Sequence, residues 1–208
     1  MSDYLSDEEQ LAKLKQWWAD NGLGLVLGLV VAIAGVVGWR WYQDDHLERA
    51  ESASDAYRTY LNARNAGDPT EALAAVIETE HGGSAYHVFA SLYSAKDAAE
   101  EEDWDAAAGH LRRAIELADE TVLQDLARVR LARVQYQLDD LDTALQTLAV
   151  VHSAGFLGDV AELTGDIHLV RGEQSLAREA YQAAVDASPG APTLPILELK
   201  LASLSKDS

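Results

Sequence analysis

The longest apolar stretch of the chain runs from Gly22 to Trp39, eighteen residues without a charged or strongly polar side chain. At about 1.5 Å per helical residue, this stretch nearly crosses the roughly 30 Å hydrocarbon core of a bilayer. Aromatic side chains, which favour the two surfaces of a bilayer, lie at its ends: Trp17, Trp18, Trp39, Trp41 and Tyr42. The pattern predicts a single transmembrane helix over residues 22–42.

Two other kinds of segment share such a pattern, a cleaved signal peptide and a buried core helix. A signal peptide has a positively charged leader and a small-residue cleavage site, whereas here the leader is net acidic and WRWYQDDH follows the apolar stretch. A core helix is seldom apolar on every side over this length. The sequence therefore favours an uncleaved membrane anchor.

The residues before the anchor, 1–21, predict a short amphipathic helix. Ser6-Asp7-Glu8-Glu9 has the pattern of a capping box, which begins a helix. The apolar residues after it fall on one face: Leu11, Leu14, Trp17 and Trp18. We expect this helix to lie along the membrane surface and to turn into the bilayer at Asn21-Gly22. A docking helix for a partner is the alternative interpretation.

Small residues recur at every fourth position of the anchor, at Gly24, Gly28 and Ala32. A stripe of this kind lets a second transmembrane helix approach closely. Since glycine is common in transmembrane helices, the stripe also fits ordinary composition. Packing of these three residues against another helix is therefore a hypothesis.

The pattern after Tyr42 is helical throughout. Apolar residues keep a period of 3.6 up to a break at residues 65–69, and a second helix is predicted from about Thr70 to Glu80, ending at Gly82-Gly83. No stretch alternates apolar and polar residues for long enough to indicate a sheet. Residues 43–208 are thus predicted to form one all-α domain.

A repeated spacing of small residues divides this domain. Ala107, Ala144 and Ala177 stand 37 and 33 residues apart, and each has a small residue twelve positions upstream, at Ala95, Ala132 and Gly165. This spacing resembles the tetratricopeptide repeat, in which two antiparallel helices cross closely where both carry small side chains. It predicts a helical solenoid closed by a further helix over residues 194–204. The alternative is an unrelated alanine-rich bundle.

The first helix of each repeat in such a solenoid lines a concave groove that binds peptides or proteins. The residues that the repeat register places in the groove are Phe89, Leu92, Lys96, Leu126, Val129, Arg133, Tyr136, Glu162, Asp166 and Leu169. Arg128, Arg130 and Arg133 form a small cationic cluster in this acidic domain. They fit either recognition of a partner or salt bridges within the domain.

Charge narrows the set of partners. The chain has 16 Lys and Arg residues and 35 Asp and Glu residues. The first 42 residues hold three of the basic and five of the acidic ones, so the domain carries 13 cations and 30 acids. Such a surface repels nucleic acid and anionic lipid headgroups, and nucleic acid is not expected as a partner. Cysteine is absent, which excludes disulfides, thiol catalysis and cysteine-bound zinc.

No motif indicates catalysis, a cofactor or a metal. The six histidines have no metal-ligand spacing, and no phosphate loop or nucleophile motif occurs. His81 and His87 flank Gly82-Gly83 and are interpreted as solvated loop residues. Asp139-Asp140 and the acidic run 100–103 lie at predicted turns, where acids start the next helix. The protein is therefore not expected to be an enzyme.

The orientation of the anchor does not follow from charge. Lys13 and Lys15 precede the apolar stretch, and Arg40 and Arg49 follow it, so the two sides are balanced. Size favours a short tail that stays in the cytoplasm and a large acidic domain that is exported.

Several features coincide in a fixed order along the chain. They are a paired aromatic before Asn21-Gly22, the exit Gly38-Trp39-Arg40-Trp41-Tyr42, Ala53-Ser54-x-x-Tyr57, Leu131-Ala132-Arg133-Val134-Gln135, and Gly165-Asp166. In this order and at these distances they resemble the YfgM family, ancillary subunits of the bacterial SecYEG translocon, over essentially the whole chain. The resemblance implies a single-pass protein of the inner membrane, with residues 1–21 in the cytoplasm and residues 43–208 in the periplasm.

The resemblance also implies partners, namely the SecYEG translocon and a PpiD-like membrane-anchored periplasmic chaperone. The expected function is a protein-binding scaffold that links translocation to periplasmic chaperones. The alternative is a stand-alone holdase or membrane-complex assembly factor that binds unfolded exported proteins in its groove. The first function predicts a fixed partner, and the second predicts many weak clients.

Overall fold

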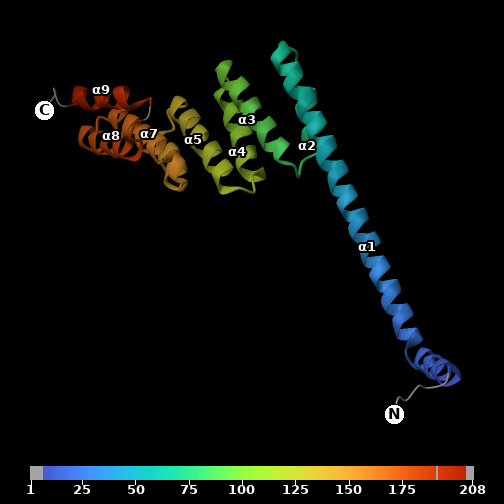
Figure 1. Ribbon diagram of the computed structural model, residues 1–208. Helices are drawn as coiled ribbons and strands as arrows, with labels where there is room; N and C mark the ends of the chain where they lie inside the picture. Colours follow the sequence, from blue (N-terminus) through green and yellow to red (C-terminus); the bar gives the residue numbers. More distant parts are fainter. Residues whose placement is uncertain (1–6, 191, 205–208) are drawn as a thin grey trace. The chain divides into compact units, whose positions relative to one another are not determined.

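A computed structural model describes residues 7–190 and 192–204 of the chain (Figure 1). The regular structure within those residues is helical and includes no strand, which confirms the predicted all-α class. Ser6, the first residue of the predicted capping box, lies outside them. The chain divides into two compact units, with the boundary between Ser52 and Ala53.

The described elements follow one another along the chain as α-helices with one short 3₁₀ helix, η1. They are α1 (Asp7–Ala66), α2 (Glu71–Glu80), α3 (Ala85–Glu100), α4 (Trp104–Leu117), α5 (Thr121–Gln137), α6 (Leu141–Ala149), η1 (Ala154–Phe156), α7 (Leu157–Val170), α8 (Gln174–Ala187) and α9 (Leu194–Leu204).

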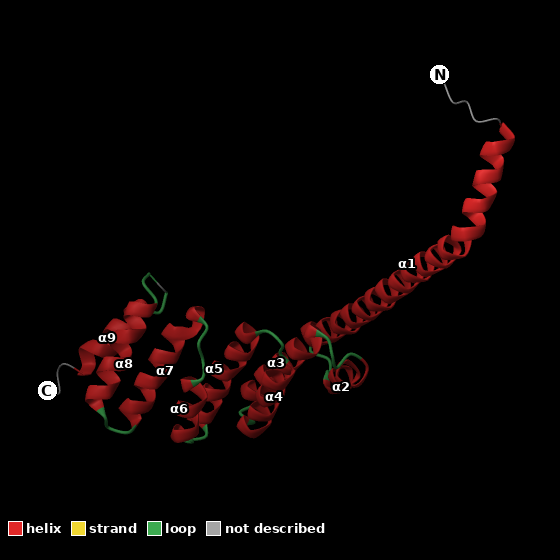
Figure 2. Ribbon diagram, turned by 90° about the horizontal axis from the view of Figure 1, so that it is seen from below, coloured by secondary structure: helices red, strands yellow, loops and turns green. Residues whose placement is uncertain are grey.

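Helix α1 passes without interruption through Asn21 and Gly22, where the sequence predicted the tail helix to end. The Asn21 side-chain amide donates a hydrogen bond to the Trp17 carbonyl (3.0 Å), four residues earlier in the same helix. The Trp18 ring covers Gly22, since a Cβ there would lie 3.1 Å from it. Glycine inside a helix costs only about 1 kcal/mol. The helix is therefore continuous where the sequence predicted a separate short helix, and it changes direction early in its course (Figures 1 and 2).

The first unit holds one helical segment that is long and apolar enough to cross a membrane, among the residues described. Its most apolar 18-residue window has a mean hydropathy of 2.3, and 6% of that window is buried. Apolar surface that is exposed to water costs roughly 25 cal/mol per Å². A contiguous apolar patch as long as this window marks contact with lipid or protein. This segment fits the predicted membrane anchor.

The second unit contains three helix pairs, formed by α3 and α4, α5 and α6, and α7 and α8. Each helix from α3 to α9 contacts the next one along the chain, and Figure 2 shows the pairs side by side. Helix α9 packs against α8 and closes the series. The pairs coincide with the three predicted repeats.

The small residues that defined the repeats are all buried where two helices cross. They are Ala95, Ala132 and Gly165 on the first helices of the pairs, and Ala107, Ala144 and Ala177 on the second. The approach is close in the third pair, where a Cβ on Gly165 would lie 2.5 Å from the Tyr181 ring. Glycine is required there because any side chain would collide with this buried ring.

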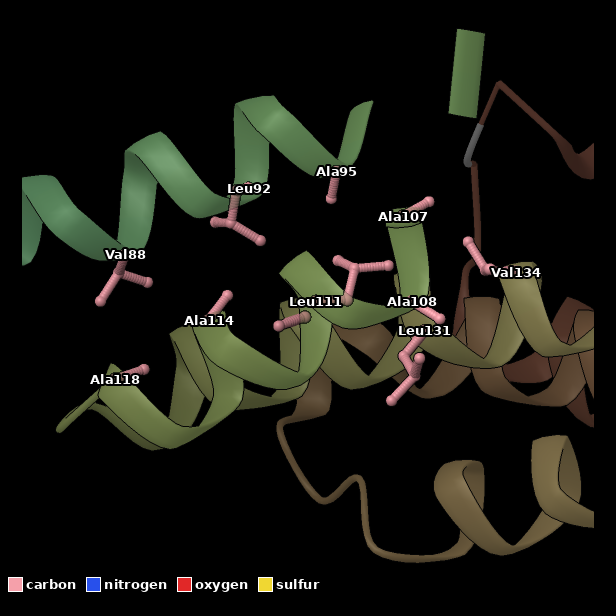
Figure 3. Packing of buried hydrophobic residues seen from close by; sticks show 11 residues of the cluster. Val88, Leu92, Ala95, Ala107, Ala108, Leu111, Ala114, Ala118, Leu131 and Val134 are labelled. Carbon is pink, nitrogen blue, oxygen red and sulfur yellow. The ribbon is translucent and has the colours of Figure 1, made fainter. Parts of the chain in front are cut away.

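The largest core cluster joins the first pair to α5. Val88, Leu92 and Ala95 of α3 point toward Leu111 and neighbouring residues of α4 (Figure 3). Leu131 and Val134 of α5 belong to the same cluster. Burial of these side chains at about 25 cal/mol per Å² is what holds the pairs together.

The turn inside each pair has the same geometry three times. The first helix ends with a residue of positive φ, which is Glu102 (60°), Asp139 (58°) or Gly172 (74°). The next residue donates its amide hydrogen to a carbonyl five positions earlier, at 2.9 Å each time: Asp103 to Ala98, Asp140 to Gln135 and Glu173 to His168. This is the Schellman motif. As predicted for the acidic turns, Asp103 and Asp140 then cap the second helix through the amides of Ala106 and Thr143.

A fourth turn of this kind ends α1, which the repeat spacing did not predict. Gly67 has a φ of 76°, and the Asp68 amide bonds to the Ala63 carbonyl at 3.0 Å. Tyr60 near the end of α1 packs with Ile77 of α2 and Ala90 of α3. The end of α1, α2 and the start of α3 thus share a small core before the three repeats.

A buried carboxylate joins the second pair to the third. Asp125 on α5 accepts hydrogen bonds from the amides of His152 (3.0 Å) and Ser153 (2.9 Å), from the Ser153 hydroxyl (2.7 Å) and from Arg128 (2.8 Å). Burial alone would raise the pKa of Asp125, but these bonds outweigh it and lower the pKa to about 2. The charged side chain therefore fixes the loop that precedes α7.

The interpretation of His87 as a solvated loop residue was wrong. His87 lies on α3, its side chain is buried, and its Nδ1 is 3.3 Å from the Gly82 carbonyl oxygen. The histidine thus holds the glycine turn before α3 against the helix. The sequence did not show this because the helix begins at Ala85, two residues before the histidine.

Candidate protein-binding groove

Two stripes of side chains face each other from α3 and α5. Phe89, Leu92, Lys96 and Ala99 follow one face of α3, and Leu126, Arg130, Arg133 and Gln137 follow one face of α5. Their spacing of three and four residues is that of a single helix face. The residues of α4 that lie between the stripes are Trp104 and Leu111.

These stripes enclose two pockets, of about 370 Å³ and about 220 Å³. Leu92, Lys96 and Arg130 line both pockets, so the two are continuous. We call the combined surface the α3–α5 groove. Its volume lies in the range of about 300–1,000 Å³ that is typical of ligand sites.

The floor of the α3–α5 groove is apolar. Leu92, Leu111 and Val134 belong to the core cluster that joins α3, α4 and α5, and they also line the groove. Trp104 adds an aromatic wall. A ligand in the groove would therefore extend the hydrophobic core of the first two repeats.

The rim carries three cationic side chains, of which two form ion pairs within the domain. Lys96 forms an ion pair with Glu100 on its own helix, and Arg133 pairs with Asp159 of α7, both at 2.5 Å. Arg130 is exposed and has no hydrogen-bond or ion-pair partner within the described part of the chain. Arg128, the third arginine of the predicted cluster, bonds instead to Asp125 and Gln124, so the three arginines do not all face the groove.

Five of the predicted groove residues line the α3–α5 groove: Phe89, Leu92, Lys96, Leu126 and Arg133. Two others do not line either pocket. Val129 is only 3% exposed, and Tyr136 packs against the second core cluster around Ala132 and Leu163. The placement of Val129 in an open groove was wrong, because the open face of α5 runs through Arg130 and Gln137, one position further along, whereas the placement of Tyr136, which is only partly buried, stays a prediction.

The remaining three predicted residues lie on α7, next to α9. Lys200 of α9 donates hydrogen bonds to Glu162 (3.0 Å) and to Asp166 (2.7 Å). Asp166 also accepts one from the Tyr181 hydroxyl (2.7 Å). Leu169 is 40% exposed. The two acids therefore serve the contact between α7 and α9.

The Lys200 ammonium lies between two carboxylates, those of Glu162 and Asp166. Burial lowers the pKa of Lys200, but Asp166 and Glu162 raise it further, so that it lies above its ordinary value. Burial, and then the bond to Asp166, raise the pKa of Tyr181. Lys200 thus stays positively charged and Tyr181 stays neutral at physiological pH.

Sequence reasoning missed Arg130, Gln137 and Trp104 as groove residues and Lys200 as a partner of α7. Arg130 was recognised only as a member of the arginine cluster. The available signal was its position four residues after Leu126 and three before Arg133, which is the helix-face spacing of the stripe. Lys200 gave no signal, since the contact depends on how α9 packs.

The predicted stripe on the anchor is uncovered in the first unit. A Cβ on Gly24 or Gly28 would meet no atom within 4 Å, and Ala32 is exposed.

The residues described contain no group of three or more His, Asp or Glu placed to hold a metal ion.

The helix pairs, their shared turn and their small crossing residues define a tetratricopeptide repeat-like helical protein. The family model described as a tetratricopeptide repeat-like domain matches residues 15–206, and so includes the anchor.

Curated relatives match the chain over almost its whole length. A protein of Haemophilus influenzae is 34% identical, covering 88% of this chain and 91% of its own; one of Escherichia coli is 29% identical, covering 99% and 100%; and one of Aggregatibacter actinomycetemcomitans is 30% identical, covering 98% and 100%. Each is named ancillary SecYEG translocon subunit. The chain belongs to the YfgM family, as the sequence motifs predicted.

Proposed function

We propose that this protein is a membrane-anchored, protein-binding scaffold that acts as an ancillary subunit of the SecYEG translocon and links translocation to periplasmic chaperones. The observation that carries the proposal is the α3–α5 groove, an open apolar surface with a polar rim, in a chain that also has a helix apolar enough to cross a membrane. Such a surface suits a polypeptide partner. The names of the near-full-length relatives supply the identity of the complex.

The proposed topology places residues 1–21 in the cytoplasm, residues 22–42 in the inner membrane and residues 43–208 in the periplasm. The exposed apolar window of α1 supports the anchor, and the family supports the direction. A PpiD-like membrane-anchored chaperone is the proposed periplasmic partner. The absence of cysteine suits an oxidising compartment.

The proposed role is non-catalytic. The polar clusters of the second unit are used within the fold: Asp125 fixes a loop, and Lys200 joins α9 to α7. The α3–α5 groove combines apolar side chains with lysine and arginine, and its lining residues include no histidine and no carboxylate. Binding is the chemistry that such a groove supports.

The test is co-purification of the full-length chain in mild detergent, with SecY, SecE and SecG measured by quantitative mass spectrometry. A photo-crosslinking amino acid at Gln137 reports contacts of the groove, and the same amino acid at Arg112, an exposed position of α4 outside its lining, is the control. We expect the translocon subunits at a fixed ratio, with crosslinks from Gln137 to the translocon or the chaperone.

The contrary result is a set of many exported proteins, each far below one copy, without enrichment of the translocon. That outcome would favour the stand-alone holdase or assembly factor, whose groove binds unfolded clients directly.

A further inference from the structure

We infer that the α3–α5 groove recognises an extended polypeptide segment in which acidic side chains alternate with apolar ones. This inference rests on the proposed function, since it specifies the ligand of the same groove. It follows from three features of the groove: the sign of its charge, the availability of its cations and the shape of its floor.

The charge of the groove is opposite to that of the domain around it. Residues 43–208 carry 30 acids and 13 cations, yet the lining residues include Lys96, Arg130 and Arg133 and no acid. Other pockets of the same unit follow the domain average. One beside α2 and α3 is lined by five acids: Glu71, Glu78, Asp97, Glu101 and Asp103. Positive charge is thus concentrated where the apolar floor is open.

The cations of the groove are available to a ligand. Arg130 has no partner within the described part of the chain and offers a planar fork of donors that fits a carboxylate. The Lys96 and Arg133 ion pairs are exposed, with the cation side chains 53% and 52% accessible. Exposed pairs contribute little to stability, so an incoming carboxylate can exchange with Glu100 or Asp159.

The spacing of the groove fits an extended segment. The two continuous pockets run along α3 and α5 and have apolar floors at Leu92 and Leu111, while the cations stand at the rim. Successive side chains of an extended chain point to opposite sides. One set can enter the floor while the other meets Lys96, Arg130 and Arg133. The Gln137 amide can both donate to and accept from the ligand backbone.

The experiment measures fluorescence anisotropy of a labelled peptide in which Leu and Phe alternate with Asp, added to the full-length chain in detergent. A matched peptide has Asn at each Asp position. We expect the acidic peptide to bind at least tenfold more tightly than the neutral one. Equal affinity of the two peptides would overturn the inference.

Two variants test the site itself. Arg130→Glu reverses the free cation, and Gln137→Glu adds an acid to the groove; both residues are exposed, so the fold is retained. We expect at least a tenfold loss of affinity for the acidic peptide with either. Arg112→Glu, an equal charge change outside the groove lining, is the matched control and should lose less than threefold. Equal losses in Arg112→Glu and Arg130→Glu would also overturn the inference.

Failure of this inference is distinguishable from failure of the proposed function. If SecY, SecE and SecG co-purify with the chain while the acidic peptide shows no preference, the scaffold function stands and the groove ligand is wrong. If the acidic peptide binds through Arg130 while the translocon is not enriched, the groove ligand stands and the assignment of the complex is wrong.

Discussion

The inner faces of the first two repeats and of the third repeat differ in what covers them. Lys96, Arg133 and Asp166 occupy the same position in successive repeats, since they are spaced 37 and 33 residues apart like the small crossing residues. The first two line the open α3–α5 groove, whereas Asp166 is held by Lys200 of α9. A repeat position thus sets where a side chain lies, and the next element decides whether it is free to bind.

The capping helix explains the difference. Helix α9 follows the third repeat and places Lys200 against Glu162 and Asp166, much as an external cationic ligand would lie. Within the described residues of the second unit no helix covers the α3–α5 groove, whose own charge is positive. The open and the covered face are therefore of opposite sign, which keeps the acidic face of α7 from competing for the same ligand.

The largest effect is expected from Gly165→Ala, which tests the close crossing of the third pair. The new Cβ would lie 2.5 Å from the buried Tyr181 ring. Overpacking of this kind costs about 2 kcal/mol, which lowers Tm by roughly 4–8 °C in circular dichroism melts. Addition of Tyr181→Leu should recover part of the loss. A variant that melts at or above the wild-type Tm would contradict the comparison.

The next effect concerns Asp125, which joins the second repeat to the loop before the third. Its folded pKa of about 2 lies below the ordinary 3.8, so protonation favours the unfolded state and stability falls as pH falls from about 4 to about 2. This difference is worth about 2 kcal/mol in full, of which about 1 kcal/mol is lost by pH 3. The measurement is the free energy of unfolding in urea at about pH 6 and about pH 3.

Asp125→Asn is the control for that pH dependence. The variant lacks the titrating group, so its stability should fall less between the two pH values than that of the wild type. Parallel curves for the two proteins would show that other carboxylates account for the acid sensitivity.

A smaller effect is expected from Lys200→Met, which uncovers the face of α7. Loss of the ammonium group leaves Glu162 and Asp166 without their cation, and both are about three-quarters buried. We expect a loss of about 1 kcal/mol. Lys96→Met is the matched change on the open face, where the exposed pair with Glu100 should contribute less than about 0.5 kcal/mol. Equal losses would remove the distinction between the two faces.

The smallest effect on stability is expected from Gly28→Leu, on the uncovered stripe of the anchor. A Cβ there meets no atom within 4 Å, so the melting temperature should stay unchanged. If Gly24, Gly28 and Ala32 pack against a partner helix, the translocon recovered with the chain should fall at least tenfold. Val31→Leu, an exposed change off the stripe, should have no effect on recovery.

The repeats could be predicted from sequence because each depends on contacts within one helix pair. A small residue such as Ala107 or Gly165 is required wherever two backbones cross, so its spacing records the fold directly. The end of α1 was also predictable, since Gly67 permits the left-handed conformation that closes a Schellman motif.

The open face of α5 could be predicted only in part. Val129 and Arg130 differ by 100° around the helix axis, and which of them is buried depends on the crossing angles of α5 with α4 and α7. The sequence placed the face through Val129, whereas the structure places it through Arg130. The Lys200 contact depends in the same way on the packing of α9, which follows a loop rather than the repeat spacing.

The pattern of contacts between successive helices bears on how the protein is made. The substantial contacts of the second unit join helices that are neighbours or next neighbours along the chain. A helix pair can therefore begin to pack as soon as its own residues have been synthesised, without waiting for a distant C-terminal partner. The α3–α5 groove is complete once residues up to Gln137 have emerged, well before α9 is made.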